Sequence, residues 1–308
     1  MAPDTSPNPA KPSGLPQALG AYLIWGFLPL YLLLVTSVPP FEFVGWRIIW
    51  TLPLCLVIIA FRKQFPEIRA AITSPRVMLM LLASSVLIAT NWFVYIWAIM
   101  QGNVYAASLG YYLNPLVNVL LGTVLLGERL SKWQWVAVAV AGGAVALLLA
   151  GALTTLWISL TLAFSFGSYG MVRKQVDVGA LPGLTLESAI LVLPASGIAY
   201  AYAVSDAGPA FGTDVTMSVL IMFSGVLTAV PLLLFAIAAR RMEYSTLGFI
   251  QYLAPTIVFF LGLFVFGEKL EPVQLMSFFL IWTAVAIFAA DMWVRSRRAK
   301  RELFTAGA

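Results

Sequence analysis

The sequence contains no histidine, and its only cysteine is Cys55. Without histidine the chain cannot build a Ser-His-Asp triad, a histidine-ligated zinc or haem site, or a histidine proton relay. A single cysteine cannot form an intrachain disulfide, a CxxC redox site or an iron–sulfur cluster. We therefore expect no cofactor and no bound metal. We interpret Cys55, which lies inside an apolar run, as a small buried residue.

Charged residues are also scarce. They make up 10% of the 308 residues, whereas 61% belong to the set AVILMFWYC. An average soluble domain is about a quarter charged, and 18 basic and 13 acidic residues cannot cover a soluble body of this size. The composition excludes a soluble globular protein and predicts an all-α polytopic membrane protein. The sequence also lacks a P-loop, a GxSxG motif and a paired acidic motif, which argues against an ATP-driven pump and a membrane enzyme.

The chain consists of ten apolar runs separated by short polar gaps. Each run is close to the roughly 20 residues that cross a bilayer as a helix. The runs are continuous and do not alternate with period two, which favours helices over a barrel. We place the spans at 15–36, 41–61, 77–100, 104–126, 133–150, 153–172, 184–204, 216–238, 244–266 and 272–294. The Pro-rich residues 1–14 predict a disordered tail, and residues 295–308 predict a basic tail.

The basic residues indicate the orientation of these spans. If the N-terminus is inside, sixteen of the 18 Lys and Arg residues fall on the inner side, only Lys269 falls on the outer side, and Arg47 lies within a span. This asymmetry follows the positive-inside rule. It predicts that the protein lies in the inner membrane and that both of its termini are in the cytoplasm. The net positive charge is thus explained by topology. We expect a lipid bilayer and a small-molecule substrate as partners, and no nucleic acid.

The chain contains an internal repeat. Residues 112–130 (YLNPLVNVLLGTVLLGERL) and 252–270 (YLAPTIVFFLGLFVFGEKL) are identical at eight of nineteen positions. Because five helices, an odd number, separate the two copies, the copies face opposite sides of the membrane. This predicts two inverted five-helix repeats, residues 15–150 and 151–294. Secondary transporters use such repeats to place a substrate site near the midplane and to open it to each side in turn. The alternative is that the duplicated helices only solve a packing problem.

Several segments of the chain carry a family resemblance. They are AYLIWGFLPLY (21–31), EFVGWRIIW (42–50), NWFVYIWA (91–98), ASLGYYLNPLVNVLLGTVLLGER (107–129), LAFSFGSYGMVRK (162–174), STLGFIQYLAPT (245–256), GEK (267–269) and IWTAVAIFAAD (281–291). Together they resemble the EamA repeats of the drug/metabolite transporter superfamily, and within it the RarD-like subfamily. The resemblance implies ten helices, with the fifth and tenth peripheral, and transport of small molecules across the cytoplasmic membrane, in the direction of export. It implies little about the cargo. Uptake, a channel and a scaffold stay open as alternatives.

Two ionisable residues within spans are the main candidates for binding or coupling. Arg47 can bind a carboxylate or phosphate through its fork, with Trp46 and Trp50 as an aromatic wall. Alternatively, Arg47 is structural, either snorkelling outward or paired with Glu187. Glu187 is a candidate proton carrier or binding site for a cationic group. Alternatively, it is a wetted helix-end residue or a fixed partner of Arg47. Asp291 is explained by a local pair with Arg295, four residues away.

Uncharged polar and aromatic residues in the spans complete the candidate cavity. The amides either line a cavity or hold helices together, and the aromatics either stack on substrate or form interfacial belts. The cavity candidates of this kind are Asn91, Trp92, Tyr111, Asn114, Asn118, Tyr169, Gln251 and Tyr252. Pro115 and Pro255 are hinge candidates, because proline removes a backbone donor and breaks the helix. Small residues of the fifth span form either a homodimer surface or internal packing. Glu128 and Glu268 are expected to cap helix ends and to have no transport role.

Overall fold

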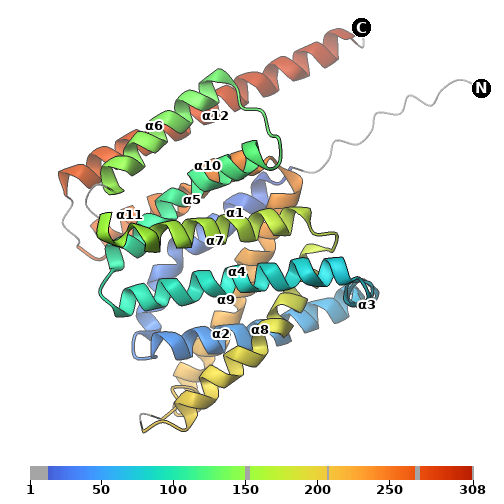
Figure 1. The fold of residues 1–308 in the computed structure, drawn as a ribbon, viewed down its shortest axis with the longest axis vertical. Helices are drawn as coiled ribbons and strands as arrows, with labels where there is room; N and C mark the ends of the chain where they lie inside the picture. Colours follow the sequence, from blue (N-terminus) through green and yellow to red (C-terminus); the bar gives the residue numbers. More distant parts are fainter. Residues whose placement is uncertain (1–12, 150–152, 207, 268–270, 307–308) are drawn as a thin grey trace, which may run out of the picture.

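The computed structural model describes residues 13–149, 153–206, 208–267 and 271–306, and within these ranges all regular secondary structure is helical (Figure 1). The elements in chain order are α1 (Leu15–Leu32), η1 (Leu33–Val35), α2 (Pro40–Arg62), α3 (Phe65–Thr73), α4 (Pro75–Met100), α5 (Val104–Val124), α6 (Lys132–Leu149), η2 (Leu153–Thr155), α7 (Leu156–Gln175), α8 (Ala180–Ala203), α9 (Val215–Arg241), α10 (Tyr244–Gln251), α11 (Leu253–Phe264) and α12 (Pro272–Ala306). The expected disordered tail, residues 1–14, lies almost wholly outside the described residues.

Nine helical segments of the described residues are long and apolar enough to cross a membrane, with mean hydropathies between 1.3 and 2.4. They include the pairs α1–η1, η2–α7 and α10–α11, each taken as one segment. The expectation of a polytopic α-helical membrane protein is confirmed. The 21-residue α5 is not among the nine, because Asn114, Asn118 and a pair of tyrosines lower its hydropathy. A tenth span therefore stays a prediction.

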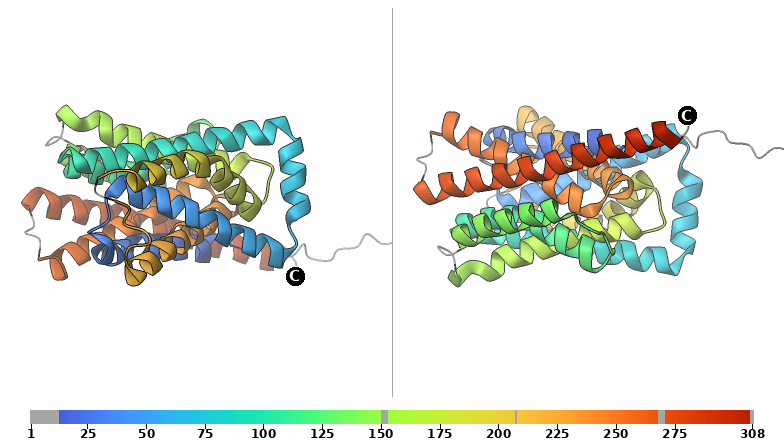
Figure 2. Two further views of the ribbon diagram at one scale, coloured as in Figure 1. Left: turned by 90° about the horizontal axis from the view of Figure 1, so that it is seen from below. Right: turned by 90° about the horizontal axis from the view of Figure 1, so that it is seen from above.

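Helix α3 is the element that the hydropathy pattern did not predict. It is a nine-residue helix that lies across one end of the bundle, while the long helices run side by side (Figure 2). The turn before it is made by Lys63, which has a positive φ of 53° and ends α2. Pro66 and Pro75 stand in the first turns of α3 and α4, where a missing backbone donor has no cost. A helix of this length cannot span a membrane, so a search for apolar runs misses it.

The two hinge candidates behave differently. Pro115 lies inside the uninterrupted α5, so the expected break at this position was wrong. A neighbouring helix can hold a proline-containing helix in line, and α5 is packed between α7 and α10. In the other repeat the helix is divided between α10 and α11, at Tyr252. This is three residues before Pro255, where the lost donor frees the carbonyl of Gln251.

Helices from the first part of the chain pack mainly against helices from the second part. Helix α2 packs on α8 and α9, α4 on α7 and α8, α5 on α7 and α10, and α1 on α9 and α11. Helices α6 and α12 pack on each other at the edge of the bundle and run antiparallel (Figure 1), as the resemblance implied. The small face of α6, with Ala137, Ala141 and Ala144 fully buried, is used for this internal packing.

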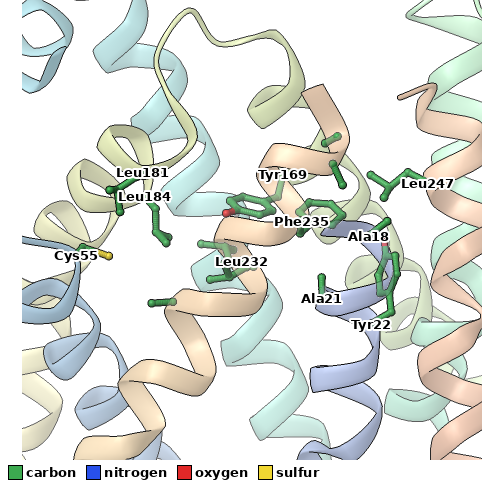
Figure 3. Close-up of a cluster of buried hydrophobic side chains, with 14 of the residues drawn as sticks. Ala18, Ala21, Tyr22, Cys55, Tyr169, Leu181, Leu184, Leu232, Phe235 and Leu247 are labelled. Atoms are coloured by element: carbon green, nitrogen blue, oxygen red, sulfur yellow. The ribbon is translucent and has the colours of Figure 1, made fainter. Parts of the chain in front are cut away.

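The largest buried apolar cluster lies among α1, α2, α7, α8 and α9. Figure 3 shows it from Cys55 on α2 to Tyr22 on α1, with Tyr169 and Phe235 between them. The rings of Tyr169 and Phe235 stack, with centroids 6.3 Å apart. Cys55 is fully buried, as expected. Several residues of this cluster also line the cavity that is described next.

Candidate functional site

A small cavity of about 20 Å³ lies where α2, α4, α7, α8 and α9 meet. It is lined by Ile48, Thr51, Ile88, Trp92, Tyr169, Leu184, Glu187, Ser188, Leu191, Thr228 and Leu232. Three of these, Tyr169, Leu184 and Leu232, face one another in Figure 3. The volume is enough for about one water molecule. Of the residues predicted from the sequence, Trp92, Tyr169 and Glu187 line this cavity.

Glu187 is held by a buried network at one side of the cavity. Arg173 Nη1 lies 3.6 Å from Glu187 Oε1, and the two side chains are 0% and 3% exposed. Ser84 Oγ donates a hydrogen bond to Glu187 Oε1, and the Tyr169 hydroxyl donates to Glu187 Oε2 over 3.4 Å. The structure therefore corrects two alternatives. Glu187 is neither wetted at a helix end nor paired with Arg47, because α7 brings Arg173 to it.

Arg173 is the functional candidate that sequence reasoning missed. It was counted among the basic residues of the inner side, although it is fully buried. Its Nη2 donates to the carbonyl of Ala180 over 2.8 Å, while Nε and Nη1 have no hydrogen-bond partner among the described residues. The guanidinium rests against the backbone of Gly183, where an added Cβ would overlap it. Its 14-residue separation from Glu187 gives no periodic signal, because the two residues lie on different helices.

Arg47 does not line this cavity, but it contacts two residues that do. Its Nε donates to Thr228 Oγ1 over 2.9 Å, and its guanidinium carbon lies 5.1 Å from the ring centroid of Trp92. Both Thr228 and Trp92 line the cavity. Within the described ranges, no carboxylate oxygen lies within 4.0 Å of Arg47. The expected pairing of Arg47 with Glu187 is thus absent, and this cation is held by a hydroxyl group and an aromatic face.

The aromatic residues near Arg47 are not the ones that its own helix suggested. Trp46 and Trp50 turn toward Phe211 in the α8–α9 connection, with ring centroids 4.4 and 5.7 Å away. The tyrosines within electrostatic range of Arg47 are Tyr111, Tyr31 and Tyr95. The rings of Tyr95 and Tyr111 form a T-shaped pair 5.7 Å apart. The ring that contacts the guanidinium, that of Trp92, comes from α4 and not from α2.

The candidate amides connect neighbouring helices. Asn91 Nδ2 donates to the carbonyl of Leu162 over 2.9 Å and to Ser165 Oγ over 3.1 Å, which joins α4 to α7. Asn118 Nδ2 donates to Gln251 Oε1 over 2.8 Å, which joins α5 to α10. None of these amides lines the cavity.

Two further candidates lie on the same α5–α10 contact. The Tyr252 hydroxyl donates to the carbonyl of Tyr112 over 3.4 Å. Asn114 is 3% exposed, and its Oδ1 has no hydrogen-bond partner among the described residues. Asn114 and Tyr252 are also absent from the lining of the cavity. Asn91, Asn118, Gln251 and Tyr252 therefore hold helices together in this conformation, whereas Asn114 makes no such bond among the described residues.

Glu42 is a second buried carboxylate that sequence reasoning missed. It lies in the first turn of α2 and is fully buried. Its Oε1 accepts hydrogen bonds from Trp46 Nε1 over 3.1 Å and from the backbone N–H of Ala210 over 2.8 Å. A carboxylate is favoured at the N-terminal end of a helix by the helix dipole. Glu42 thereby fastens the α8–α9 connection to α2.

Two expectations about other acidic residues had different outcomes. The capping role of Glu128 is confirmed, since its carboxylate accepts from the N–H groups of Tyr244 and Ser245, over 2.5 and 2.8 Å, at the start of α10. Glu268 lies outside the described residues. The local pair of Asp291 with Arg295 was wrong. Asp291 accepts from Ser131 Oγ over 2.8 Å, and Arg295 donates to Gln134, because both side chains turn toward α6.

Comparison with known proteins gives consistent matches. The model of the EamA-like transporter family matches residues 12–150. Protein RarD of Escherichia coli (strain K12) is 40% identical over 297 residues, which cover 94% of this chain and 97% of RarD. The uncharacterized transporter PA0485 of Pseudomonas aeruginosa is 41% identical over 288 residues, which cover 92% of this chain and 96% of that protein.

A solved crystal structure superposes on this chain with a TM-score of 0.71 and 19% sequence identity. The superposition covers 90% of this chain and 98% of the chain in that structure. At this identity the likeness shows the fold alone. The relatives match nearly the whole chain at about 40% identity, and the described residues contain nine apolar helices. The chain therefore belongs to the EamA-like transporter family, as a RarD-like member of the drug/metabolite transporter superfamily and a multi-pass protein of the inner membrane.

Proposed function

We propose that this protein is a secondary transporter that exports small organic solutes by alternating access. The observation that carries the proposal is the shared cavity, whose lining comes from α2 and α4 in the first part of the chain and from α7, α8 and α9 in the second. One charged side chain, Glu187, lines it, and a second, Arg47, contacts Thr228 and Trp92 of its lining. Ionisable groups at membrane depth are costly, and they usually mark a substrate or ion pathway.

The proposal includes ten membrane helices in two inverted repeats. In this proposal α5 is a membrane span in addition to the nine apolar helices of the described residues. The polar residues of α5 are compatible with a bilayer because α7 and α10 cover them. The antiparallel pairing of α6 with α12 supports the inversion, since each of these helices follows one copy of the repeated GE[R/K]L segment. Both termini are placed in the cytoplasm by the distribution of basic residues.

The small volume of the cavity defines the conformational step. Sites for small organic molecules usually enclose about 300 Å³ or more, whereas this cavity has about 20 Å³. A solute can enter only if α2, α4, α8 and α9 move apart. In the proposed cycle, α5 bends at Pro115 and the α10–α11 segment bends at its discontinuity near Pro255. These two bends open the cavity to one side at a time.

The test is an export assay that assumes no particular cargo. Cells that express the protein, and cells that express a variant with the cavity filled, are compared by untargeted metabolite profiling of the medium. Ser188→Phe fills the cavity because Ser188 is 5% exposed and lines it. Ser205→Phe, at the exposed end of α8, is the matched control. We expect at least one solute to accumulate in the medium with the wild type and the control, but not with Ser188→Phe.

Purified protein in liposomes then separates a transporter from the alternatives. A transporter gives slow, saturable flux of the identified solute and counterflow against a preloaded gradient, whereas a channel gives flux without saturation or counterflow. A scaffold gives no flux, and the Ser188→Phe substitution does not change its function. Solute that disappears from the medium when the protein is made would replace export by uptake.

A further inference from the structure

Arg47 is a membrane-embedded cation with no anionic partner among the described residues. It is the eighth residue of α2, so it lies about 10 Å along the helix from its start. The only side-chain hydrogen bond of Arg47 in the described structure joins Nε to Thr228 Oγ1. The two terminal nitrogens have no hydrogen-bond partner within the described ranges, and neither is fully buried. The fork of the guanidinium, which binds carboxylates with two parallel hydrogen bonds, is therefore left without a partner in the part of the chain that the structure describes.

The surroundings of Arg47 exclude snorkelling toward the lipid surface. Thr228 on α9 and Trp92 on α4 hold the guanidinium from two different helices. Both residues also line the cavity. A snorkelling arginine extends along its own helix to the membrane surface and makes no such contacts between helices. The guanidinium is instead held between helices, beside two residues of the cavity lining.

The two buried carboxylates of the same region are engaged elsewhere. Glu187 is paired with Arg173 and accepts from Ser84 and Tyr169. Glu42 accepts from the N–H of Ala210 and from Trp46 Nε1. Neither lies within 4.0 Å of Arg47. An isolated cation at this depth is costly, and an anion from outside the chain is the group that compensates it.

The neighbouring aromatic rings indicate what is attached to that anion. Trp92 lies under the guanidinium, and Tyr95, one turn further along α4, pairs with Tyr111 of α5. Tyr111 is 44% exposed, so part of its ring is not covered by other described residues. Aromatic faces favour flat, apolar groups, and the phenolic hydroxyls can donate to an oxygen of the anion.

Resting on the proposed transport function, we infer that the transported solute is an organic anion. Its carboxylate binds the free fork of Arg47, and its flat apolar body lies against Trp92, Tyr95 and Tyr111. The Arg173–Glu187 pair takes no direct part in binding this solute, because each member already neutralises the other.

Three compounds of one shape test the charge requirement: 3-phenylpropionate, its neutral amide 3-phenylpropionamide, and the cation 3-phenylpropylammonium. Each is titrated into the wild-type protein in phosphatidylcholine nanodiscs, where no anionic lipid competes, and binding is followed by quenching of tryptophan fluorescence. We expect the carboxylate to bind at least about tenfold more tightly than the amide, as loss of a charged hydrogen-bonded pair predicts, and the ammonium compound not to bind. Equal affinities, or no binding of the carboxylate, would overturn the inference.

Variants test whether Arg47 is the anchor. Arg47→Gln is expected to bind the carboxylate no better than the amide, and Arg47→Lys is expected to fall between the two because it keeps the charge but loses the fork. Arg69→Gln removes an exposed cation from α3 and is expected to leave all affinities unchanged. Carboxylate binding by Arg47→Gln at the wild-type affinity would contradict the assignment even if the anion preference holds.

The metabolite profiles separate this inference from the proposed function. If the solutes released by the wild type are mainly carboxylates or other anions, both stand. If they are mainly amines or neutral compounds, the protein is still a transporter and the anion inference fails. If no solute depends on the protein, the proposed function fails as well.

Discussion

At the scale of single residues, the buried pair of Arg173 and Glu187 shows how a charge is tolerated inside this protein. Each member is nearly inaccessible, and each makes one or two additional hydrogen bonds. A buried ion pair contributes little net stability, because desolvation offsets the attraction between its members. Removing only one member, however, leaves the other charged and buried without a partner. The pair is therefore expected to matter most when it is broken on one side.

Single and double substitutions test this asymmetry. Glu187→Gln and Arg173→Gln are each expected to destabilise the protein by roughly 3–5 kcal/mol, whereas the double variant Arg173→Met/Glu187→Met regains most of the loss. The measurement is the apparent melting temperature of detergent-purified protein. If Glu187→Gln melts like the wild type but loses proton-driven accumulation of solute, Glu187 acts as a proton carrier, and the structural interpretation of the pair is wrong.

The contacts of the charged residues could not be predicted from the sequence, although their importance could. The depth of Arg47 and Glu187 in apolar runs is visible from hydropathy alone. Their partners are not, because Thr228 is 181 residues away from Arg47 and Arg173 reaches Glu187 only after α7 and α8 fold against each other. Arg173 also stands near the end of an apolar run, where a basic residue is ordinarily explained by topology.

At the scale of helices, Glu128 connects one part of the chain to the other. It precedes α6, yet its carboxylate accepts three hydrogen bonds at the start of α10, two from the N–H groups of Tyr244 and Ser245 and one from Ser245 Oγ. The first N–H groups of a helix have no partner within that helix. The helix dipole also stabilises an anion at this end of the helix. Space for this contact depends on Gly122, where an added Cβ would lie 2.6 Å from Glu128 Oε2.

Removing this carboxylate is expected to loosen the start of α10. Glu128→Ala should lower the free energy of unfolding by roughly 1–3 kcal/mol, since buried donors lose their acceptor. Hydrogen exchange, followed by mass spectrometry, should speed up in the peptide that contains Tyr244 and Ser245. Glu67→Ala, which removes an exposed carboxylate from α3, is the matched control. Unchanged exchange in Glu128→Ala would show that other contacts hold this end of α10.

Glycine allows a close approach of two helix backbones in the cavity region. A Cβ added at Gly225 of α9 would lie 2.6 Å from the carbonyl carbon of Trp50 in α2. These helices also carry the Arg47–Thr228 hydrogen bond, so they cannot separate without disturbing the site. In contrast, an added Cβ at Gly142 of α6 would meet no atom within 4 Å. The two glycines thus form a matched pair of test positions.

Alanine at these two positions should have opposite effects. Gly225→Ala is expected to destabilise the protein by roughly 1–3 kcal/mol through overpacking, and to weaken solute binding by moving Thr228. Gly142→Ala is expected to be neutral or slightly stabilising, because alanine favours helix over glycine by up to about 1 kcal/mol. Melting temperatures in detergent provide the measurement. Equal melting temperatures for the two variants would show that α2 and α9 can move apart at little cost.

At the scale of the whole molecule, the apolar runs predicted most helices within a few residues, since length and composition determine what a bilayer accepts. The apolar runs were less informative where a helix must both cross the bundle and carry polar side chains. Helix α5 must be helical across the bundle, yet it carries the amides that join it to α10, so its mean hydropathy falls below that of the other long helices. The short α3 had no signal of this kind, because it lies across the end of the bundle and does not traverse it.

The proposed inverted arrangement makes a prediction that hydropathy alone does not. Lys132 and Glu271 follow the two copies of the repeated GE[R/K]L segment, and both side chains are exposed. If the repeats are inverted, these residues lie on opposite sides of the membrane. Cys55 is buried and is the only cysteine, so Cys55→Ser provides a background in which Lys132→Cys and Glu271→Cys can be made one at a time.

A membrane-impermeant maleimide, applied to intact cells, is expected to label Glu271→Cys and to reach Lys132→Cys only after the membrane is permeabilised. This result follows from the antiparallel pairing of α6 and α12, because antiparallel spans must start on opposite faces of the bilayer. Labelling of both cysteines from the same side would mean that the five segments between them, α6, α7, α8, α9 and α10–α11, do not all cross the membrane. The repeats would then be parallel, and alternating access by exchange of two inverted halves would lose its structural basis.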